Sequence, residues 1–231
     1  MQEGSGYLME DTAGTIAYPV ITYIPAPEEL VISAKEITRY LGYGRETVPE
    51  TDQGLIDRGR EQVKKLMAGK ACYSRFPVVC MEDDRIQMPY GVIKSRHLSR
   101  NIAGCKEIYI FAATIGAAFD RFLTRTRLTS MAEAAVLQAC GAAAIEAVCD
   151  ALNEKLRIEA EAEGKVLCSR YSPGYGDLAL DNQRGVFEVL NPPKYIGLSL
   201  MDTMIMSPEK SVTAIIGIRE KQDGEASSLP E

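Results

Sequence analysis

The chain has 231 residues, of which 46% are hydrophobic and 25% are charged, and its formal net charge is −6 at pH 7. Its length allows one large domain or two small ones around a sizeable core. The negative balance argues against a nucleic-acid-binding protein, which needs a basic surface. No apolar run approaches the roughly 18 residues of a membrane span, and the polar N-terminus does not read as a signal peptide, so we expect a cytoplasmic protein.

Six cysteines and one histidine limit the chemistry that side chains can supply. No two cysteines form a CxxC pair, so the ligand spacing of a zinc site is absent and no metal site is expected. Scattered cysteines in a chain without a secretion signal are typical of reduced thiols. His97 lies beside Arg96 and Arg100 and is interpreted as a surface residue rather than a general base.

The first 70 residues are predicted to form a helical extension that packs on the main domain. A β-prone segment covers Thr15–Ile24. Ser33-Ala34-Lys35-Glu36 is a capping box that opens a short helix ending near Leu41. Asp52 is in a position to cap a second helix, which would run to about Met67 and stop at Gly69.

The main domain, residues 71–220, is predicted to begin with strands. Tyr73–Met81 and Ile86–Ile93 read as a hairpin around an acidic turn, and Ser95–Ala103 as a short helix. The continuous apolar run Ile108–Thr114 predicts a buried strand, which leads through Gly116 into a helix over Ala117–Arg127. A strand–glycine–helix junction can present backbone N–H groups to an anion, although most such junctions are only turns.

Ser130-Met131-Ala132-Glu133 is a second capping box and starts the longest predicted helix, which reaches about Arg157. Its many alanines allow close packing, so we place it in the middle of the domain. Glu146 is the only charged residue between Ala134 and Cys149. A carboxylate in such a run faces solvent, finds a cationic partner or is protonated. Asp150, one turn later, is expected to repel it.

The C-terminal third mixes short strands with one helix. The predicted elements are a connection over Glu159–Lys165, a strand over Val166–Cys168, a helix over Asp177–Leu190, strand-like pieces at Tyr195–Leu200, Met204–Met206 and Val212–Ile218, and a disordered tail over 221–231. Helices and strands do not alternate regularly, which favours α+β with a largely antiparallel twisted sheet, a long central helix and the N-terminal helical extension. Neither a GxGxxG nor a Walker sequence is present.

The stretch Arg170-Tyr171-Ser172-Pro173-Gly174-Tyr175-Gly176 is the most informative one. Pro173 fixes its own φ, and the two glycines permit positive φ and a close approach to the backbone. Arg170 can fork onto a carboxylate or phosphate, and Tyr175 can cover a flat group. Composition alone also fits an ordinary surface turn.

Four segments in order resemble the activation, or reactivation, domain of cobalamin-dependent methionine synthase. The Arg-x-Ser-Pro-Gly-Tyr pattern of 170–175 resembles its S-adenosylmethionine-binding motif. Residues 107–116 (EIYIFAATIG) resemble its strand ending in a Thr-x-Gly turn, residues 144–157 (AIEAVCDALNEKLR) its central helix, and residues 206–214 (MSPEKSVTA) its Met-x-Pro-x-x-Ser-Val strand entry. Residues 37–44 (ITRYLGYG) look like the stand-alone form of the domain.

The resemblance implies a function. A protein of this kind binds S-adenosylmethionine and docks on a cobalamin-bearing methionine synthase, where flavodoxin or a similar donor supplies an electron and the ligand methylates the cobalamin. It implies that Glu146 holds the cationic end of the ligand, that Arg170 holds its carboxylate, and that Ser172, Gly174 and Tyr175 line the site. Thr114, Gly116 and Ser211 are further candidates. No catalytic acid or base is expected, because methyl transfer needs position and a good leaving group.

The sequence also departs from the family. It has neither the cobalamin-binding Asp-x-His-x-x-Gly loop nor a zinc-binding cysteine set, so it would act on the cobalamin of a partner. After Arg219 the chain turns polar, where the family continues with a tyrosine-bearing strand. Two alternatives therefore remain open: a non-catalytic S-adenosylmethionine-binding sensor or scaffold, and an activator of another corrinoid methyltransferase.

Overall fold

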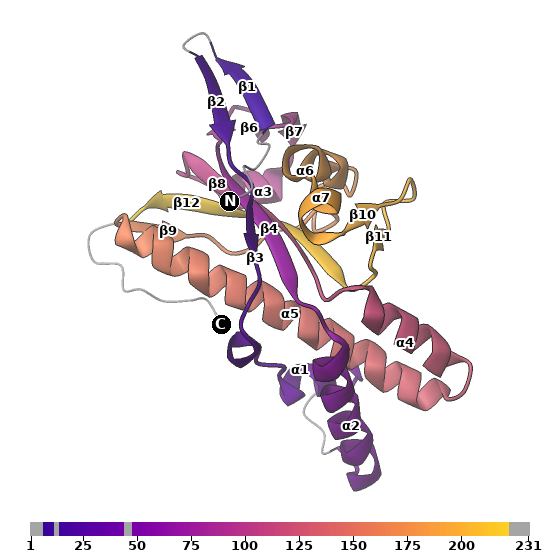
Figure 1. Ribbon diagram of the computed structural model, residues 1–231. Coiled ribbons are helices and arrows are strands. Elements are labelled where there is room, and N and C mark those ends of the chain that lie inside the picture. Colours follow the sequence, from indigo (N-terminus) through magenta and orange to yellow (C-terminus); the bar gives the residue numbers. More distant parts are fainter. Residues whose placement is uncertain (1–6, 12–13, 44–47, 222–231) are drawn as a thin grey trace.

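The computed structural model describes residues 7–11, 14–43 and 48–221. Its centre is a five-stranded sheet in the order β3-β4-β8-β12-β9, in which every neighbouring pair is antiparallel (Figure 1). The strands are β3 (Ile21–Tyr23), β4 (Lys70–Pro77), β8 (Glu107–Thr114), β12 (Ser211–Glu220) and β9 (Lys165–Leu167). The predicted α+β class with a largely antiparallel sheet and a long central helix is confirmed.

Helices cover both faces of this sheet. On one face lies the 32-residue helix α5 (Met131–Ala162), and α1 (Ala34–Tyr40), α2 (Glu50–Leu66) and α4 (Ala117–Arg127) pack against it (Figure 1). The other face carries α3 (Arg96–Asn101), α6 (Asn182–Leu190) and α7 (Pro192–Ile196). The three central strands are therefore largely buried on both sides, and β8 and β12 are mostly apolar in sequence for that reason.

Strand β8 shows how the two layers share one sheet. Phe111 and Ala113 face the α5 layer, whereas Ile108, Ile110 and Ala112 face the layer of α6 and α7. Successive strand residues point to opposite faces, so an uninterrupted apolar run supplies both cores at once.

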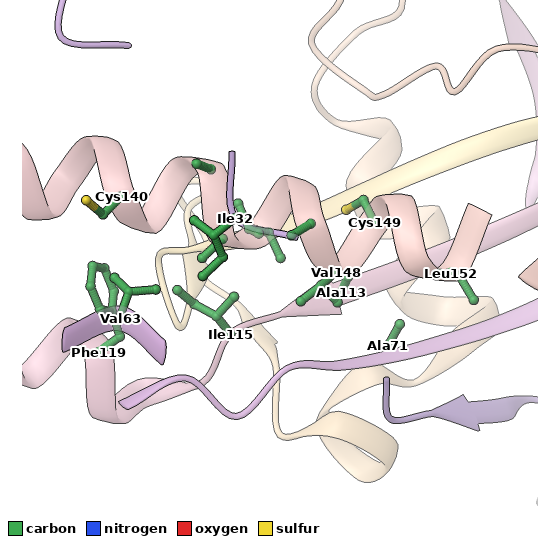
Figure 2. Close-up of a cluster of buried hydrophobic side chains, with 14 of the residues drawn as sticks. Ile32, Val63, Ala71, Ala113, Ile115, Phe119, Cys140, Val148, Cys149 and Leu152 are labelled. Atoms are coloured by element: carbon green, nitrogen blue, oxygen red, sulfur yellow. The ribbon is translucent and has the colours of Figure 1, made fainter. Parts of the chain in front are cut away.

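Small side chains let α5 approach its neighbours closely (Figure 2). A Cβ on Gly141 would lie 2.7 Å from Cζ of the buried Phe119 on α4, and one on Gly59 of α2 would lie 2.9 Å from Cys140 Sγ. Contrary to the expectation from the sequence, α5 contains an 18-residue stretch that is apolar enough to cross a membrane, but 72% of that stretch is buried inside the protein. It is therefore a core helix, as its alanine-rich sequence predicts.

The remaining strands form small sheets at the periphery. They are β1 (Tyr7–Asp11) with β2 (Gly14–Tyr18), then β5 (Val79–Cys80), β6 (Arg85–Met88) and β7 (Gly91–Lys94), and finally β10 (Ser199–Leu200) with β11 (Met206–Ser207). The 3-10 turn η1 covers Pro27–Glu29.

The hairpin expected over residues 73–93 is wrong in its first half. The first predicted strand is split, and its main part, β4, pairs with β3 and β8 in the central sheet, because it buries Tyr73 on one face and Phe76 on the other. The acidic turn joins only β5 and β6, with Asp83 and Asp84 at positive φ.

Two helix boundaries also differ from expectation. Helix α5 continues to Ala162 instead of ending near Arg157, because Arg157 forms ion pairs with Glu154 and Glu161 within the helix. The chain turns away just after the helix at Gly164, which has a φ of +74°. The helix expected from Asp177 starts only at Asn182. The reason lies in the carboxylate of Asp177, which is engaged by another helix, as described below.

Near the C-terminus, Tyr195 lies in the short helix α7 rather than in a strand, because Asn191 adopts a left-handed conformation and Pro192 opens a new helical turn. In the N-terminal region, Pro49 rather than Asp52 precedes α2. The proposed tail 221–231 lies outside the described residues apart from Lys221.

Candidate ligand-binding site

The structure brings Glu146 and Arg170 together, although they are 24 residues apart in the chain. Arg170 Nη2 donates a hydrogen bond to Glu146 Oε2 at 3.1 Å, and Arg170 Nη1 donates one to Asp150 Oδ1 at 2.7 Å. Both carboxylates lie on α5, one turn apart. The expected repulsion between Asp150 and Glu146 is confirmed, because Asp150 raises the pKa of Glu146, and the guanidinium that donates to both carboxylates offsets part of this repulsion.

A single β-bridge fixes Arg170 in this position. The N–H of Tyr171 donates to the carbonyl of Ile215 on β12, and the N–H of Ile215 donates to the carbonyl of Tyr171, both at 2.9 Å. Tyr171 packs into the core on the α6 side of the sheet. Neighbouring residues of an extended segment point to opposite faces, so Arg170 is directed to the α5 side.

The electrostatics of the site are those of a half-buried ion cluster. Burial raises the pKa of Glu146, Arg170 opposes this effect, and Asp150 and Glu36 reinforce it. Burial acts to lower the pKa of Arg170, but Cys149 and the carboxylates of Asp150 and Glu146 together outweigh burial, and the pKa lies above its usual value. The cluster thus holds one guanidinium between two carboxylates, and burial disfavours the charged form of Glu146.

Helix α1 lies beside Glu146. From the sequence, α1 was expected to have only a structural role. Glu36 and Arg39 act on the pKa of Glu146, and Glu146 helps to raise the pKa of Tyr40, after the larger effect of burial. Ser33 caps α1 through the N–H of Glu36, as its capping box predicts. That motif identified the helix, but nothing in it indicated that the helix lies beside Glu146.

The segment after Arg170 forms a compact loop. Pro173 is buried and Ser172 half-buried, whereas Gly174 and Tyr175 are exposed, with 69% of Tyr175 accessible. The N–H of Tyr175 donates to the Ser172 carbonyl at 3.1 Å, and the N–H of Gly174 donates to the Leu178 carbonyl at 2.8 Å. The predicted turn is therefore an ordered loop that leaves a tyrosine ring open to solvent.

The secondary candidates Thr114, Gly116 and Ser211 also come together, but at a different place. Thr114 pairs with Ser211 in the β8–β12 register, and Thr114 Oγ1 accepts a hydrogen bond from the N–H of Gly116 at 3.1 Å. Ser211 Oγ donates to the Pro208 carbonyl at 2.7 Å. Ser211 lies four positions before Ile215 on β12, which is about 13 Å at roughly 3.3 Å per residue. These three residues therefore close strand ends rather than contact the Arg170 cluster.

Two other features lie apart from this cluster. A cavity of about 420 Å³ is lined by residues of β3, β4, β8 and the end of α5, among them Tyr73 and Tyr109, and contains none of the candidate residues. Within the described ranges, no group of histidine, cysteine and acidic residues is arranged to hold a metal. None of the six cysteines forms a disulfide, and Cys105 Sγ lies 3.5 Å from Cys168 Sγ.

Comparison with known proteins supports the fold. No family model matches the chain, and no curated protein sequence matches it. The fold is nevertheless similar to that of a solved structure. The chain is similar to the crystal structure of the MetH reactivation domain bound to AdoHcy, with a TM-score of 0.64 and 15% sequence identity. The match covers 90% of this chain and 80% of that chain, and at this identity it shows the fold alone.

Proposed function

We propose that this chain binds S-adenosylmethionine and serves as an accessory subunit for the reductive methylation of cob(II)alamin on a separate cobalamin-dependent methionine synthase. Three lines support the proposal: the Arg-x-Ser-Pro-Gly-Tyr segment, the shared fold with a reactivation domain bound to AdoHcy, and the meeting of Glu146 with Arg170.

The meeting of Glu146 with Arg170 carries the proposal. S-adenosylmethionine has a carboxylate, an ammonium and a sulfonium, so a site for it needs charges of both signs. The ligand carboxylate takes Arg170 from Asp150, whose side chain is 69% exposed and returns to water at little cost. The cationic groups of the ligand meet Glu146, whose pKa burial has raised and which gains from a positive neighbour.

The loop supplies the rest of the proposed site. Ser172 and Gly174 offer backbone groups where a ligand can approach closely, and the exposed ring of Tyr175 covers the adenosine or the methyl end. Thr114, Gly116 and Ser211 stand as secondary contacts for a ligand that extends along β12.

The proposed reaction needs a partner protein. One electron from flavodoxin or a similar donor reduces cob(II)alamin on the partner to cob(I)alamin. The cobalt then forms a bond to the methyl carbon, the sulfonium sulfur keeps the electron pair of the broken S–CH₃ bond, and the products are methylcobalamin and S-adenosylhomocysteine. No proton moves, so the side chains of this chain bind and orient rather than act as acid or base.

Calorimetry on the wild type, Arg170→Ala and Glu146→Gln tests the ligand and the residues. We expect binding of S-adenosylmethionine to the wild type and a loss of at least about tenfold in each variant, the size of one charge-assisted contact. An absence of heat with the wild type would contradict the ligand assignment. Equal affinity in all three proteins would contradict the residue assignments.

A second experiment tests the role. The chain is mixed with a cob(II)alamin-loaded methionine synthase that lacks its own reactivation domain, together with reductant and S-adenosylmethionine. The absorbance of methylcobalamin is expected to appear only when the chain is present. If the ligand binds but no methylcobalamin forms, a sensor or scaffold, or an activator of another corrinoid protein, becomes the better account.

A further inference from the structure

The two ends of the loop that follows Arg170 are fixed by different elements. Its first end is held by the bridge between Tyr171 and Ile215 on β12. Its second end is held by the carboxylate of Asp177, which accepts hydrogen bonds from Ser95 Oγ at 2.6 Å, from the N–H of Arg96 at 2.8 Å and from the N–H of His97 at 3.2 Å. The loop therefore spans from the central sheet to the beginning of α3.

The attachment at Asp177 is specific. Ser95 Oγ also accepts the N–H of Leu98 at 3.1 Å, so Ser95 and Asp177 together bind the first three N–H groups of α3. The hydrogen bond from Ser95, followed by those from the backbone N–H groups, lowers the pKa of Asp177 to about 2. The carboxylate is therefore ionised across the working range of the protein and holds α3 with charge-assisted bonds.

The shape of the loop depends on this attachment. Gly176 precedes Asp177 at φ +52°, and a Cβ there would lie 2.5 Å from the hydroxyl of Tyr171 and against the ring of His97. The Leu178 N–H donates to the Tyr175 carbonyl at 3.0 Å, and the Leu178 carbonyl accepts from Gly174, so the residue after Asp177 closes the loop from inside. Movement of Asp177 away from α3 would release Gly174, Tyr175 and Gly176 together.

We propose that Asp177 is a positioning residue, which fixes the loop from Ser172 to Gly176 in its ligand-binding shape by fastening it to α3. This inference rests on the proposed function, because it assumes that the loop contacts S-adenosylmethionine. A loop that is already ordered spends less conformational entropy when the ligand arrives. Loss of Asp177 weakens binding by on the order of tenfold, without any contact between Asp177 and the ligand.

The test compares Asp177→Ala, Asp177→Asn and the control Asp181→Asn. Asp181 lies four residues further on, is exposed, and forms no side-chain capping bond at the start of α6. Two quantities are measured: hydrogen exchange of residues 171–178 without ligand, and the dissociation constant of S-adenosylmethionine by calorimetry. Exchange in α5 and β8 serves as the internal reference for global stability.

In Asp177→Ala we expect faster exchange in the loop, unchanged exchange in α5 and β8, and the weakened binding. Asp177→Asn keeps one acceptor oxygen and lies between alanine and the wild type, and Asp181→Asn behaves as the wild type. Wild-type exchange or wild-type affinity in Asp177→Ala overturns the proposal. If the wild type binds no ligand, the proposed function fails and the positioning role fails with it. Accelerated exchange alone would then make Asp177 a structural clamp.

Discussion

Replacement of Arg170 by alanine is the sharpest test of the charge cluster. The change removes two hydrogen bonds, to Glu146 at 3.1 Å and to Asp150 at 2.7 Å, and leaves two carboxylates one turn apart on α5. A hydrogen bond to a protected charged group contributes about 1.5–3 kcal/mol, and an exposed ion pair about 0–1 kcal/mol. The side chains of Glu146 and Asp150 are 38% and 69% exposed, so we expect a total loss of about 1–2 kcal/mol near neutral pH.

The loss should depend on pH with a defined sign. Burial holds the pKa of Glu146 above its usual value, and Arg170 opposes that shift, so its removal raises the pKa further. A carboxyl with a raised pKa binds its proton more tightly in the folded state than in the unfolded state. The stabilisation that comes from this tighter proton binding is complete below the pKa of Glu146 in the unfolded state. It is lost as pH rises through the pKa of Glu146 in the folded state. The deficit of Arg170→Ala is therefore small at about pH 4.5 and full at about pH 7.5.

Urea unfolding at both pH values measures this effect. The double variant Arg170→Ala with Glu146→Gln is the control, because it removes the uncompensated charge and should regain part of the stability at the higher pH. If Arg170→Ala unfolds as the wild type does at both pH values, the guanidinium does not balance the two carboxylates and the description of the cluster is wrong.

Three further predictions concern the core, a helix cap and the ligand. Gly141→Ala places a Cβ 2.7 Å from Cζ of the buried Phe119, so overpacking of about 1–3 kcal/mol should outweigh a helix-propensity gain of at most about 1 kcal/mol. The control Gly54→Ala places a Cβ only against the end of a flexible arginine side chain, at 3.5 Å, and should be stabilising. If the melting temperatures of Gly141→Ala and Gly54→Ala shift in the same direction, the described packing of Gly141 is wrong. Ser130→Ala removes the acceptor for the Glu133 N–H and should lower the free energy of unfolding in urea by about 1 kcal/mol. Ser130→Asp should retain most of the stability. An alanine variant as stable as the wild type would show that this cap does not stabilise α5. S-adenosylmethionine at about 100 times its dissociation constant should stabilise the wild type by about 2.7 kcal/mol and Glu146→Gln by clearly less, and equal shifts in the melting temperature would remove Glu146 from the site.

Local signals in the sequence predicted several elements well. The capping boxes at Ser33 and Ser130 place the starts of α1 and α5 where the structure has them. The apolar run that became β8 was recognised because both of its faces are buried. Each of these signals lies within a few residues of the element that it predicts, so no tertiary information was needed.

Other features depended on contacts between distant segments. The acidic turn after β5 was read as the centre of one hairpin, but β4 is recruited to the central sheet by β8, more than 30 residues further along the chain. Aspartate is common at the start of a helix, and Asp177 was therefore expected to begin α6. Its carboxylate binds the first N–H groups of α3 instead. The residues next to Asp177 in the sequence do not show which of two helix N-termini its carboxylate binds.

The candidate site was predicted in part for the same reason. The lone glutamate in an apolar run and the arginine before a Ser-Pro-Gly turn pointed to Glu146 and Arg170, and the structure places them in contact. Asp150 was judged by its spacing on one helix alone, which predicts repulsion and omits the cation that bridges both residues. The nearness of α1 to Glu146 has no signature in the sequence, because it follows from how two helices pack.

Helices α1 and α2 determine which shortened versions of this chain would keep the core around α5 covered. Ile37, Ile56 and Val63 belong to the same core cluster as Cys140 and Val148 on α5. Figure 2 shows Val63, Cys140 and Val148 of this cluster. A shortened chain that begins at residue 71 would retain Glu146 and Arg170 but would expose the apolar side of the helix that carries Glu146. Such a fragment would be prone to self-association through that surface. A polypeptide meant for isolated binding studies should therefore keep the first 70 residues, even though the segment from Arg170 to Tyr175 lies a hundred residues beyond them.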